Sequence, residues 1–401
     1  MSPRTTLPTA AALPALPRTA ALLALPRTAA LLGLPRTAAL LSLPRTAALV
    51  ALPLLLAGCE LGPKQSQQTG YRGAGLDQIT NLSLVAKQAA IPAPLYALPP
   101  EGGERASEVY QNVKVLGDVS AERFNLLMAS MSQWVAPPEQ GCTYCHNPEN
   151  MASDEKYTKI VARRMLQMTR TLNTRWASHV QKTGVTCWTC HRGNAVPEYR
   201  WAETEGNVTM RTIVGNKHGQ NTPDQTVGYS SLPSNAFENY LRGTAQIRVA
   251  AGSAFPDPAK HHASIKDAEA SYGLMMHVSQ SLGVNCTYCH NTQSFRSWSL
   301  SRAQRATAYY GIRMVRDVND RYISSLTPVF PAYRKGPHGD PYKVNCMTCH
   351  QGLSKPLGGV SMLADNQMLV GPPVPVAAPE GGPAEDAREA FRQPEEITKK
   401  Q

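Results

Sequence analysis

Four short motifs contain the residues of this 401-residue chain whose types and spacing could do chemistry. Each has two cysteines separated by two residues and followed at once by a histidine: Cys142-Thr-Tyr-Cys145-His146, Cys187-Trp-Thr-Cys190-His191, Cys286-Thr-Tyr-Cys289-His290 and Cys346-Met-Thr-Cys349-His350. This spacing attaches a c-type haem, because the two thiols add across the haem vinyl groups and the short loop presents the histidine to the iron. We therefore expect four covalently attached haems.

Two other chemistries use paired cysteines and fit less well. Zinc ribbons contain Cys-x-x-Cys pairs but do not require a histidine directly after each pair. The chain has only ten histidines, so four such coincidences are improbable. Thioredoxin-like redox pairs lack that histidine too, and they do not come in fours. Eight of the nine cysteines lie in the motifs and Cys59 stands alone, so we expect no structural disulfide.

A six-coordinate haem iron needs a second ligand from the opposite face, and three methionines are placed to supply it. Met128, Met165 and Met275 each lie on the apolar face of the helix expected before motifs one, two and three. A methionine on such a face usually fills the core, but one such helix ahead of each of three motifs favours ligation. The neighbouring methionines are the runners-up for this role and are expected to be core residues instead: Met131, Met168 and Met276.

The fourth haem has two candidate ligands, His179 and Met314. His179 follows Met165 by fourteen residues, or about four turns and about 21 Å of helix, so both side chains point roughly the same way. One helix could thus serve two haems. If all four irons are six-coordinate, none is open to a substrate, which favours an electron relay over a multihaem reductase.

The N-terminal segment 1–58 is typical of a lipoprotein-type signal. It contains nine-residue repeats that begin with Leu-Pro-Arg-Thr-Ala-Ala, and it ends in an apolar run too short to span a bilayer comfortably. That run closes on Leu56-Ala57-Gly58-Cys59, which resembles the bacterial lipoprotein cleavage box. We therefore expect Cys59 to become the new N-terminus and to carry a lipid. The alternatives are a retained anchor and an unprocessed free thiol.

The net charge of +11 could suggest a nucleic-acid partner, because clustered Lys and Arg bind phosphate. Five of the 40 basic residues, however, precede Cys59 with no acidic residue among them: Arg4, Arg18, Arg27, Arg36 and Arg45. The remaining 35 basic residues stand against 29 acidic ones, a balance of +6 that haem propionates would reduce further. We expect no nucleic-acid partner.

The expected fold is mainly α with long loops, a multihaem cytochrome c of two pseudo-symmetric halves, each with two helix–CxxCH haem units. After the signal segment, the chain divides into an N-terminal lipid-anchored extended segment (59–105), a first dihaem half (106–200), a connector (201–234), a second dihaem half (235–359) and a Pro/Ala-rich disordered tail (360–401). The tail is rich in Pro, Ala, Gly and Glu, so it has little apolar surface to offset its ordering entropy.

These features together resemble the tetrahaem cytochrome subunit of purple-bacterial photosynthetic reaction centres. The stretches that carry the resemblance are Asn125–His146, Met165–His191, Leu274–His290 and Tyr309–Gly352. The resemblance implies an electron-transfer subunit that is not an enzyme. It would relay electrons from a soluble periplasmic donor, either a small cytochrome c or a high-potential iron-sulfur protein, to the photo-oxidised bacteriochlorophyll special pair. The subunit would sit on the periplasmic face of the inner membrane, docked on the L and M subunits of a complex that also contains H, and held by lipid on Cys59.

The resemblance also implies a sixth ligand for each haem: Met128 for motif one, Met165 for motif two, Met275 for motif three and His179 for motif four. Met314 would then be a packing residue. The haem of motif three would lie nearest the special pair, followed by those of motifs four, two and one. The alternative is a periplasmic multihaem carrier that is not attached to a photosystem.

Overall fold

The computed structural model describes residues 62–68, 77–204, 224–245, 247, 249 and 265–372, all of which belong to one compact unit. Cys59, the repeats of the signal segment and residues 373–401 lie outside the described residues, so the expectations for them stay predictions. Among the described helices, none is both long enough and apolar enough to cross a bilayer.

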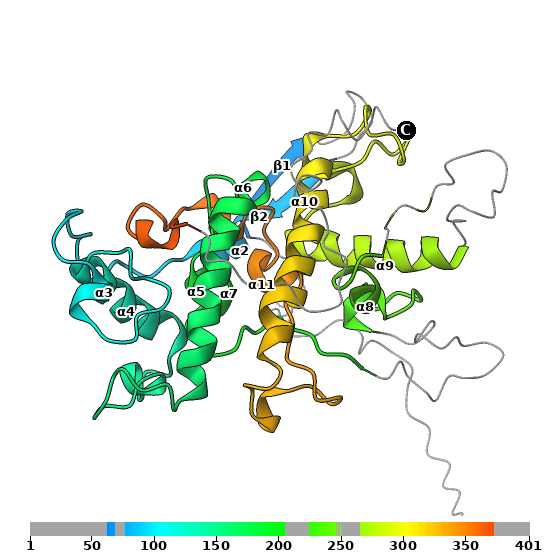
Figure 1. Cartoon of the computed structure of the whole chain (residues 1–401). Helices are drawn as coiled ribbons and strands as arrows, with labels where there is room; N and C mark the ends of the chain where they lie inside the picture. The colour runs from blue at the N-terminus through cyan, green and yellow to red at the C-terminus, as the bar shows by residue number, and fades with distance from the viewer. Residues whose placement is uncertain are drawn as a thin grey trace, which may run out of the picture. The chain divides into compact units, whose positions relative to one another are not determined.

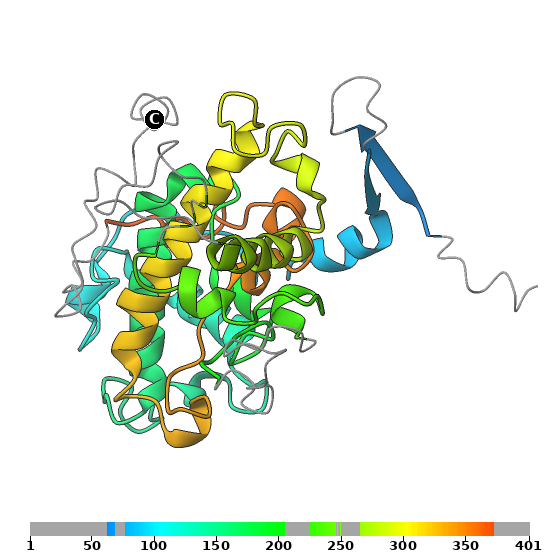
Figure 2. The same cartoon turned by 90° about the vertical axis from the view of Figure 1, so that its right-hand side faces the viewer.

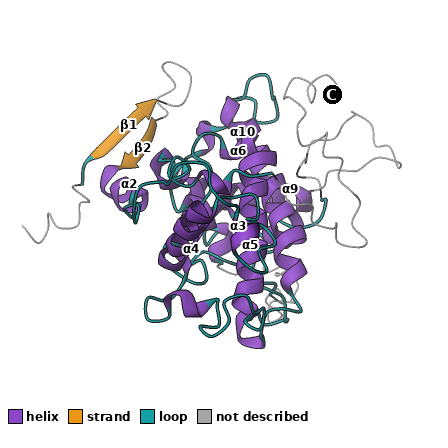
Figure 3. Ribbon diagram, turned by 60° about the vertical axis from the view of Figure 1, so that its left-hand side comes forward, coloured by secondary structure: helices purple, strands orange, loops and turns teal. Residues whose placement is uncertain are grey.

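Helices dominate the described residues, as Figures 1 and 3 show, which confirms the mainly α expectation. The helices are α2 (Leu82–Ala89), α3 (Ala106–Val109), α4 (Ala121–Val135), α5 (Tyr157–Arg175), α6 (Ala177–Val180), α7 (Cys187–His191), α8 (Ala236–Tyr240), α9 (Ile265–Leu282), α10 (Ala303–Asp317) and α11 (Cys346–His350). A π-helical turn, Val318–Ile323, extends α10. The only described sheet is an antiparallel hairpin of β1 (Lys64–Gln68) and β2 (Asp77–Asn81), seen at one edge in Figure 2. The hairpin and α2 fall in the segment expected to be extended.

The order of elements around the first two motifs returns around the last two. Helix α4 leads to a 3-10 turn at motif one, then to α5 and to motif two on α7. Helix α9 leads to a 3-10 turn at motif three, then to α10 and to motif four on α11. In each series, the first helix packs on the motif helix that closes it, α4 on α7 and α9 on α11.

Three clusters of buried apolar side chains hold this arrangement together. The first joins α4 to the middle of α5, and it buries Met131, as expected for a core methionine. The second joins α8, α9 and α10 around Trp201 and Phe237. The third lies between α5 and α10, where Met314 packs with Trp176. Helix α4 ends at Val135 because the following prolines cannot continue it, as the sequence predicts.

The disordered tail does not begin at residue 360. Met362, Met368 and Leu369 are buried in the first cluster, and the carbonyl of Met368 accepts a hydrogen bond of 3.1 Å from Arg170 Nε. The expected boundary was wrong because these few apolar side chains bury enough surface to offset the ordering of a short segment.

Candidate haem sites

Motifs one and three lie on 3-10 turns, Gly141–Tyr144 and Cys286–Tyr288. In both, the histidine backbone N–H donates to the carbonyl of the first cysteine at 3.0 Å, from His146 to Cys142 and from His290 to Cys286. The motif therefore closes as one turn. This closure keeps the two thiols and the imidazole of each motif close together, as attachment to a single haem requires.

Motifs two and four form single helical turns, and a buried threonine caps each turn. The backbone N–H of Thr186 donates to Thr189 Oγ1 at 3.0 Å, and that of Asn345 donates to Thr348 Oγ1 at 2.9 Å. These are capping boxes, and they satisfy backbone donors at the start of the turn. Sequence reasoning missed this role, although the shared Cys-x-Thr-Cys pattern of the two motifs was the available signal.

Replacing Thr348 by valine removes this cap while keeping the shape of the side chain. The buried Asn345 N–H and the Tyr199 carbonyl both lose their partner, so we expect the free energy of unfolding to fall by about 1–3 kcal/mol. Thr143→Val in motif one is the matched control, because Thr143 is exposed and water can replace its hydroxyl. Urea unfolding measures both; an equal effect of the two variants would contradict the capping role.

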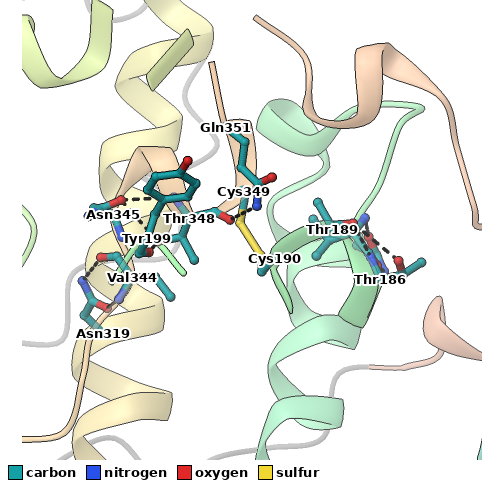
Figure 4. The surroundings of a disulfide bond; sticks show 12 residues. Thr186, Thr189, Cys190, Tyr199, Asn319, Val344, Asn345, Thr348, Cys349 and Gln351 are labelled. Atoms are coloured by element: carbon teal, nitrogen blue, oxygen red, sulfur yellow. Dashed lines mark hydrogen bonds between the residues drawn. A yellow bond between two sulfur atoms is a disulfide. The ribbon is translucent and has the colours of Figure 1, made fainter. Parts of the chain in front are cut away.

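Asn319, on the π-helical turn, fixes the approach to motif four. Its side-chain amide pairs with the backbone of Val344, donating to the carbonyl at 3.0 Å and accepting from the N–H at 2.9 Å. The same amide donates to the Leu241 carbonyl at 2.9 Å. Figure 4 shows Asn319 beside Val344, one residue before the cap of α11. Helix α10 and its extension thus position the fourth motif.

The five histidines predicted to bind iron share one hydrogen-bond arrangement. In each, Nδ1 lies 2.8–3.1 Å from a backbone carbonyl: His146 with Met151, His179 with Thr307, His191 with Asn194, His290 with Phe295 and His350 with Leu353. A carbonyl can only accept, so Nδ1 carries the proton and Nε2 keeps its lone pair. Metal-binding histidines have this arrangement, so these residues fit an axial haem ligand.

His277 shows the contrast with a structural histidine. Its Nε2 lies 3.1 Å from Ser281 Oγ, and its ring packs edge-on against Phe237 with 4.4 Å between the ring centroids. Burial lowers the pKa of His277 to about 3, so the ring is neutral. His277 is therefore a core residue of α9.

His179 and His350, the two ligands expected for the fourth iron, lie beside each other with their ring planes inclined by 66°. Their ring centroids lie 6.0 Å apart. The two rings are thus close enough to serve one iron. Burial lowers the pKa of His350 to about 4, with the nearby His179 as a further cause, and burial also lowers the pKa of His179. Both rings are thus neutral at pH 7, as iron ligation requires.

Met165 and His179 do not lie on one continuous helix, so the expectation that one helix carries both residues was wrong. Helix α5 ends at Arg175 and α6 begins after Trp176, whose backbone leaves the helical conformation. The Trp176 indole donates to Asp317 at 3.0 Å and so anchors the break to the end of α10. The direction of the His179 side chain therefore cannot be read from its spacing to Met165. The contact between Trp176 and Asp317 sets it instead.

The three predicted methionine ligands lie half-buried on the expected helices, Met128 on α4, Met165 on α5 and Met275 on α9. For Met128, a contact made by a neighbouring residue shows which way its face of α4 points. Ser132, one turn later on the same face, has its Oγ 3.7 Å from Cys142 Sγ of motif one. This face of α4 is therefore turned toward motif one.

Cys190 and Cys349 form a disulfide with a Cα–Cα distance of 4.6 Å, shown in Figure 4. The expectation that no cysteine forms a disulfide is therefore wrong for this structure. The pairing arises because α7 and α11 pack against each other, which brings the last cysteines of motifs two and four together. A sulfur in a disulfide cannot also hold a haem vinyl group, so the disulfide and the haem-bound state exclude each other at these two residues.

The other six motif cysteines are free thiols: Cys142, Cys145, Cys187, Cys286, Cys289 and Cys346. Burial raises the pKa of Cys187 and of Cys346 to about 12, and that of Cys289 to about 11. Burial thus disfavours the free thiolate at each of these three cysteines. Within the described residues, no group of three or more Cys, His, Asp or Glu side chains could hold a metal ion. The zinc alternative thus has no support from the geometry.

Haem-attachment motifs whose histidines keep Nε2 free define a c-type cytochrome. The model of the family "Photosynthetic reaction centre cytochrome C subunit" matches residues 60–370. The chain belongs to this family. It is 49% identical to the photosynthetic reaction center cytochrome c subunit of Rubrivivax gelatinosus, over 81% of this chain and 88% of that protein. The subunits of that name from Thermochromatium tepidum and Roseobacter denitrificans are 46% and 39% identical, over 78% of this chain and 76% and 87% of theirs.

Family membership confirms the functional class predicted from the sequence. The chain is a reaction-centre cytochrome c subunit that transfers electrons, and it is not an enzyme. Covalently bound haem c belongs to this class.

Proposed function

We propose that this subunit binds four c-type haems and relays electrons from a soluble periplasmic donor to the photo-oxidised special pair. The observation that carries the proposal is the His179–His350 pair, two half-buried rings with their centroids 6.0 Å apart and with Nδ1 of each hydrogen-bonded to a backbone carbonyl, which leaves Nε2 free. Such a pair would close both faces of one iron. A closed iron can exchange an electron but cannot bind a substrate.

The remaining ligands follow the same plan. His146 and Met128 would bind the haem of Cys142 and Cys145, His191 and Met165 that of Cys187 and Cys190, and His290 and Met275 that of Cys286 and Cys289. The haem of Cys346 and Cys349 would take His350 and His179. Each haem would supply the iron that changes oxidation state. The protein's part is to hold the ligands, to exclude water and to keep the motifs at fixed positions.

The ligand types predict how the potentials are ordered. Histidine–methionine ligation raises a haem potential relative to ligation by two histidines. Under this plan, three haems have histidine–methionine ligation and the fourth has two histidine ligands. We infer that the axial ligands of motif four lower the potential of its haem relative to the three haems with histidine–methionine ligation.

Two related halves would each carry two haems. The support is the repeated order of elements and one repeated hydrogen bond. The backbone N–H of Gly193, after motif two, donates to the Trp134 carbonyl of α4 at 3.0 Å. That of Gly352, after motif four, donates to the Ser281 carbonyl of α9 at 2.8 Å. In each half, the exit from the motif helix is thus tied to the helix that carries a predicted methionine ligand.

The family and the N-terminal segment support the proposed partners and location. The subunit would lie on the periplasmic face of the inner membrane, against the L and M subunits of a complex that includes H, with a lipid on Cys59. A small cytochrome c or a high-potential iron-sulfur protein would supply electrons. Nucleic acid has no place in this function.

Flash spectroscopy of membranes tests the proposal. A single flash should oxidise the special pair and then, as the special pair recovers, one of the haems. Haems that stay reduced, in a protein that does not co-purify with bacteriochlorophyll, would favour the free periplasmic carrier. Carbon monoxide binding to a native ferrous haem would instead show an open iron and favour a reductase.

A further inference from the structure

Gly311 lies in the middle of α10, where a glycine needs a physical reason. Glycine in a helix interior is less favourable than alanine, because its backbone loses more conformational freedom. The reason is on the neighbouring helix. A Cβ atom added at Gly311 would lie 2.5 Å from Cε1 and 2.8 Å from Nδ1 of His179, far inside van der Waals contact. The imidazole therefore occupies the space that any other side chain would fill.

The same gap gives His179 its hydrogen-bond partner. The Thr307 carbonyl, one turn before Gly311, accepts from His179 Nδ1 at 2.9 Å. Side chains on a helix lean toward its N-terminus, so the side chain at position 311 would cover the carbonyl at position 307. Glycine leaves this carbonyl open to a donor from outside the helix. Gly311 and the Thr307 carbonyl thus form one notch on α10. The notch gives the His179 ring both the space that it occupies and the acceptor for its Nδ1 proton.

We propose that this notch is the positioning element that seats His179 as the sixth ligand of the fourth haem. It fixes the ring against α10 and holds the proton on Nδ1, so that Nε2 is the ligating atom. The inference rests on the proposed function, because it takes His179 as an axial ligand. It adds a residue, Gly311, which binds no haem itself but decides whether the ligand can reach its place.

The test is the Gly311→Ala substitution in the full reaction-centre complex, read by electron paramagnetic resonance of the oxidised haems. We expect the low-spin signal of one haem to be lost and a high-spin signal to replace it, because the added methyl group displaces His179. Added imidazole should restore the low-spin state. Thr307→Val is the control on the same notch, since it changes the side chain and keeps the carbonyl; it should give the unaltered spectrum.

A companion variant, His179→Ala, separates the two proposals. If His179→Ala leaves all four low-spin signals intact, His179 is not a ligand and the proposed ligation itself fails. If His179→Ala removes one signal and Gly311→Ala does not, only the notch is overturned.

A combined variant keeps the test valid if Gly311→Ala alone folds poorly. In the His179→Ala background the ring is gone, so adding Gly311→Ala should no longer lower the thermal midpoint. An equal loss of midpoint in both backgrounds would show that Gly311 serves some purpose other than seating His179.

Discussion

Replacing His179 by methionine should raise the midpoint potential of one haem, the fourth, by roughly 0.1–0.3 V. Methionine stabilises ferrous iron relative to a second histidine, and axial ligands as a class set haem potentials over about 0.8 V. The change should be confined to one haem because the His179 ring lies beside His350, the proposed ligand of that haem alone. A redox titration with spectra resolved for each haem measures it.

The matched control is Met314→Leu. Met314 was the rival sixth ligand for the fourth haem, but it is buried among Trp176, Val318 and other apolar side chains of the third cluster. Leucine keeps most of this packing and cannot bind iron, so we expect all four potentials to stay where they are. A shift in Met314→Leu together with an unchanged titration in His179→Met would reverse the assignment.

The second large effect is expected at Arg170 on α5, between Met165 and His179. Its side chain is 1% exposed and donates to the Met368 and Val115 carbonyls and to both carboxylate oxygens of Asp118. Arg170→Met leaves the two buried carbonyls without a donor, while the half-exposed Asp118 can regain water. We expect the free energy of unfolding to fall by about 2–4 kcal/mol, less than for a pair in which both partners are buried.

Lys114→Met is the surface counterpart of this substitution. Lys114 also pairs with an aspartate, Asp154, but its side chain is 59% exposed, and such pairs contribute less than about 1 kcal/mol. Calorimetric unfolding of the two variants side by side gives the comparison. A similar small change in both would show that Arg170 does not hold α5 to residues 115–118 and 368.

Local sequence patterns predicted the features that depend on local spacing. The four motifs, the end of α4 before the prolines and the core role of Met131 all follow from residues close together in the chain. In these cases the chemistry of a few neighbouring residues decides the outcome.

Contacts between distant segments decided the rest. The partner of His179 Nδ1 is a carbonyl 128 residues away, so no pattern around His179 could reveal it. The break at Trp176 depends on an indole bond to Asp317, on another helix. By sequence, residues 362–369 resemble the rest of the polar tail. Only the structure shows that they cover the first apolar cluster. The Cys190–Cys349 pair likewise follows from the packing of two motif helices that are far apart in sequence.

The central claim is that eight thiols hold four haems, and peptide mass mapping of the mature protein under non-reducing conditions tests it most directly. We predict four haem-bearing peptides, one for each motif, with Cys190 and Cys349 both in thioether linkage. A peptide pair joined by a Cys190–Cys349 disulfide, or fewer than four haem peptides from the fully matured complex, would contradict the account.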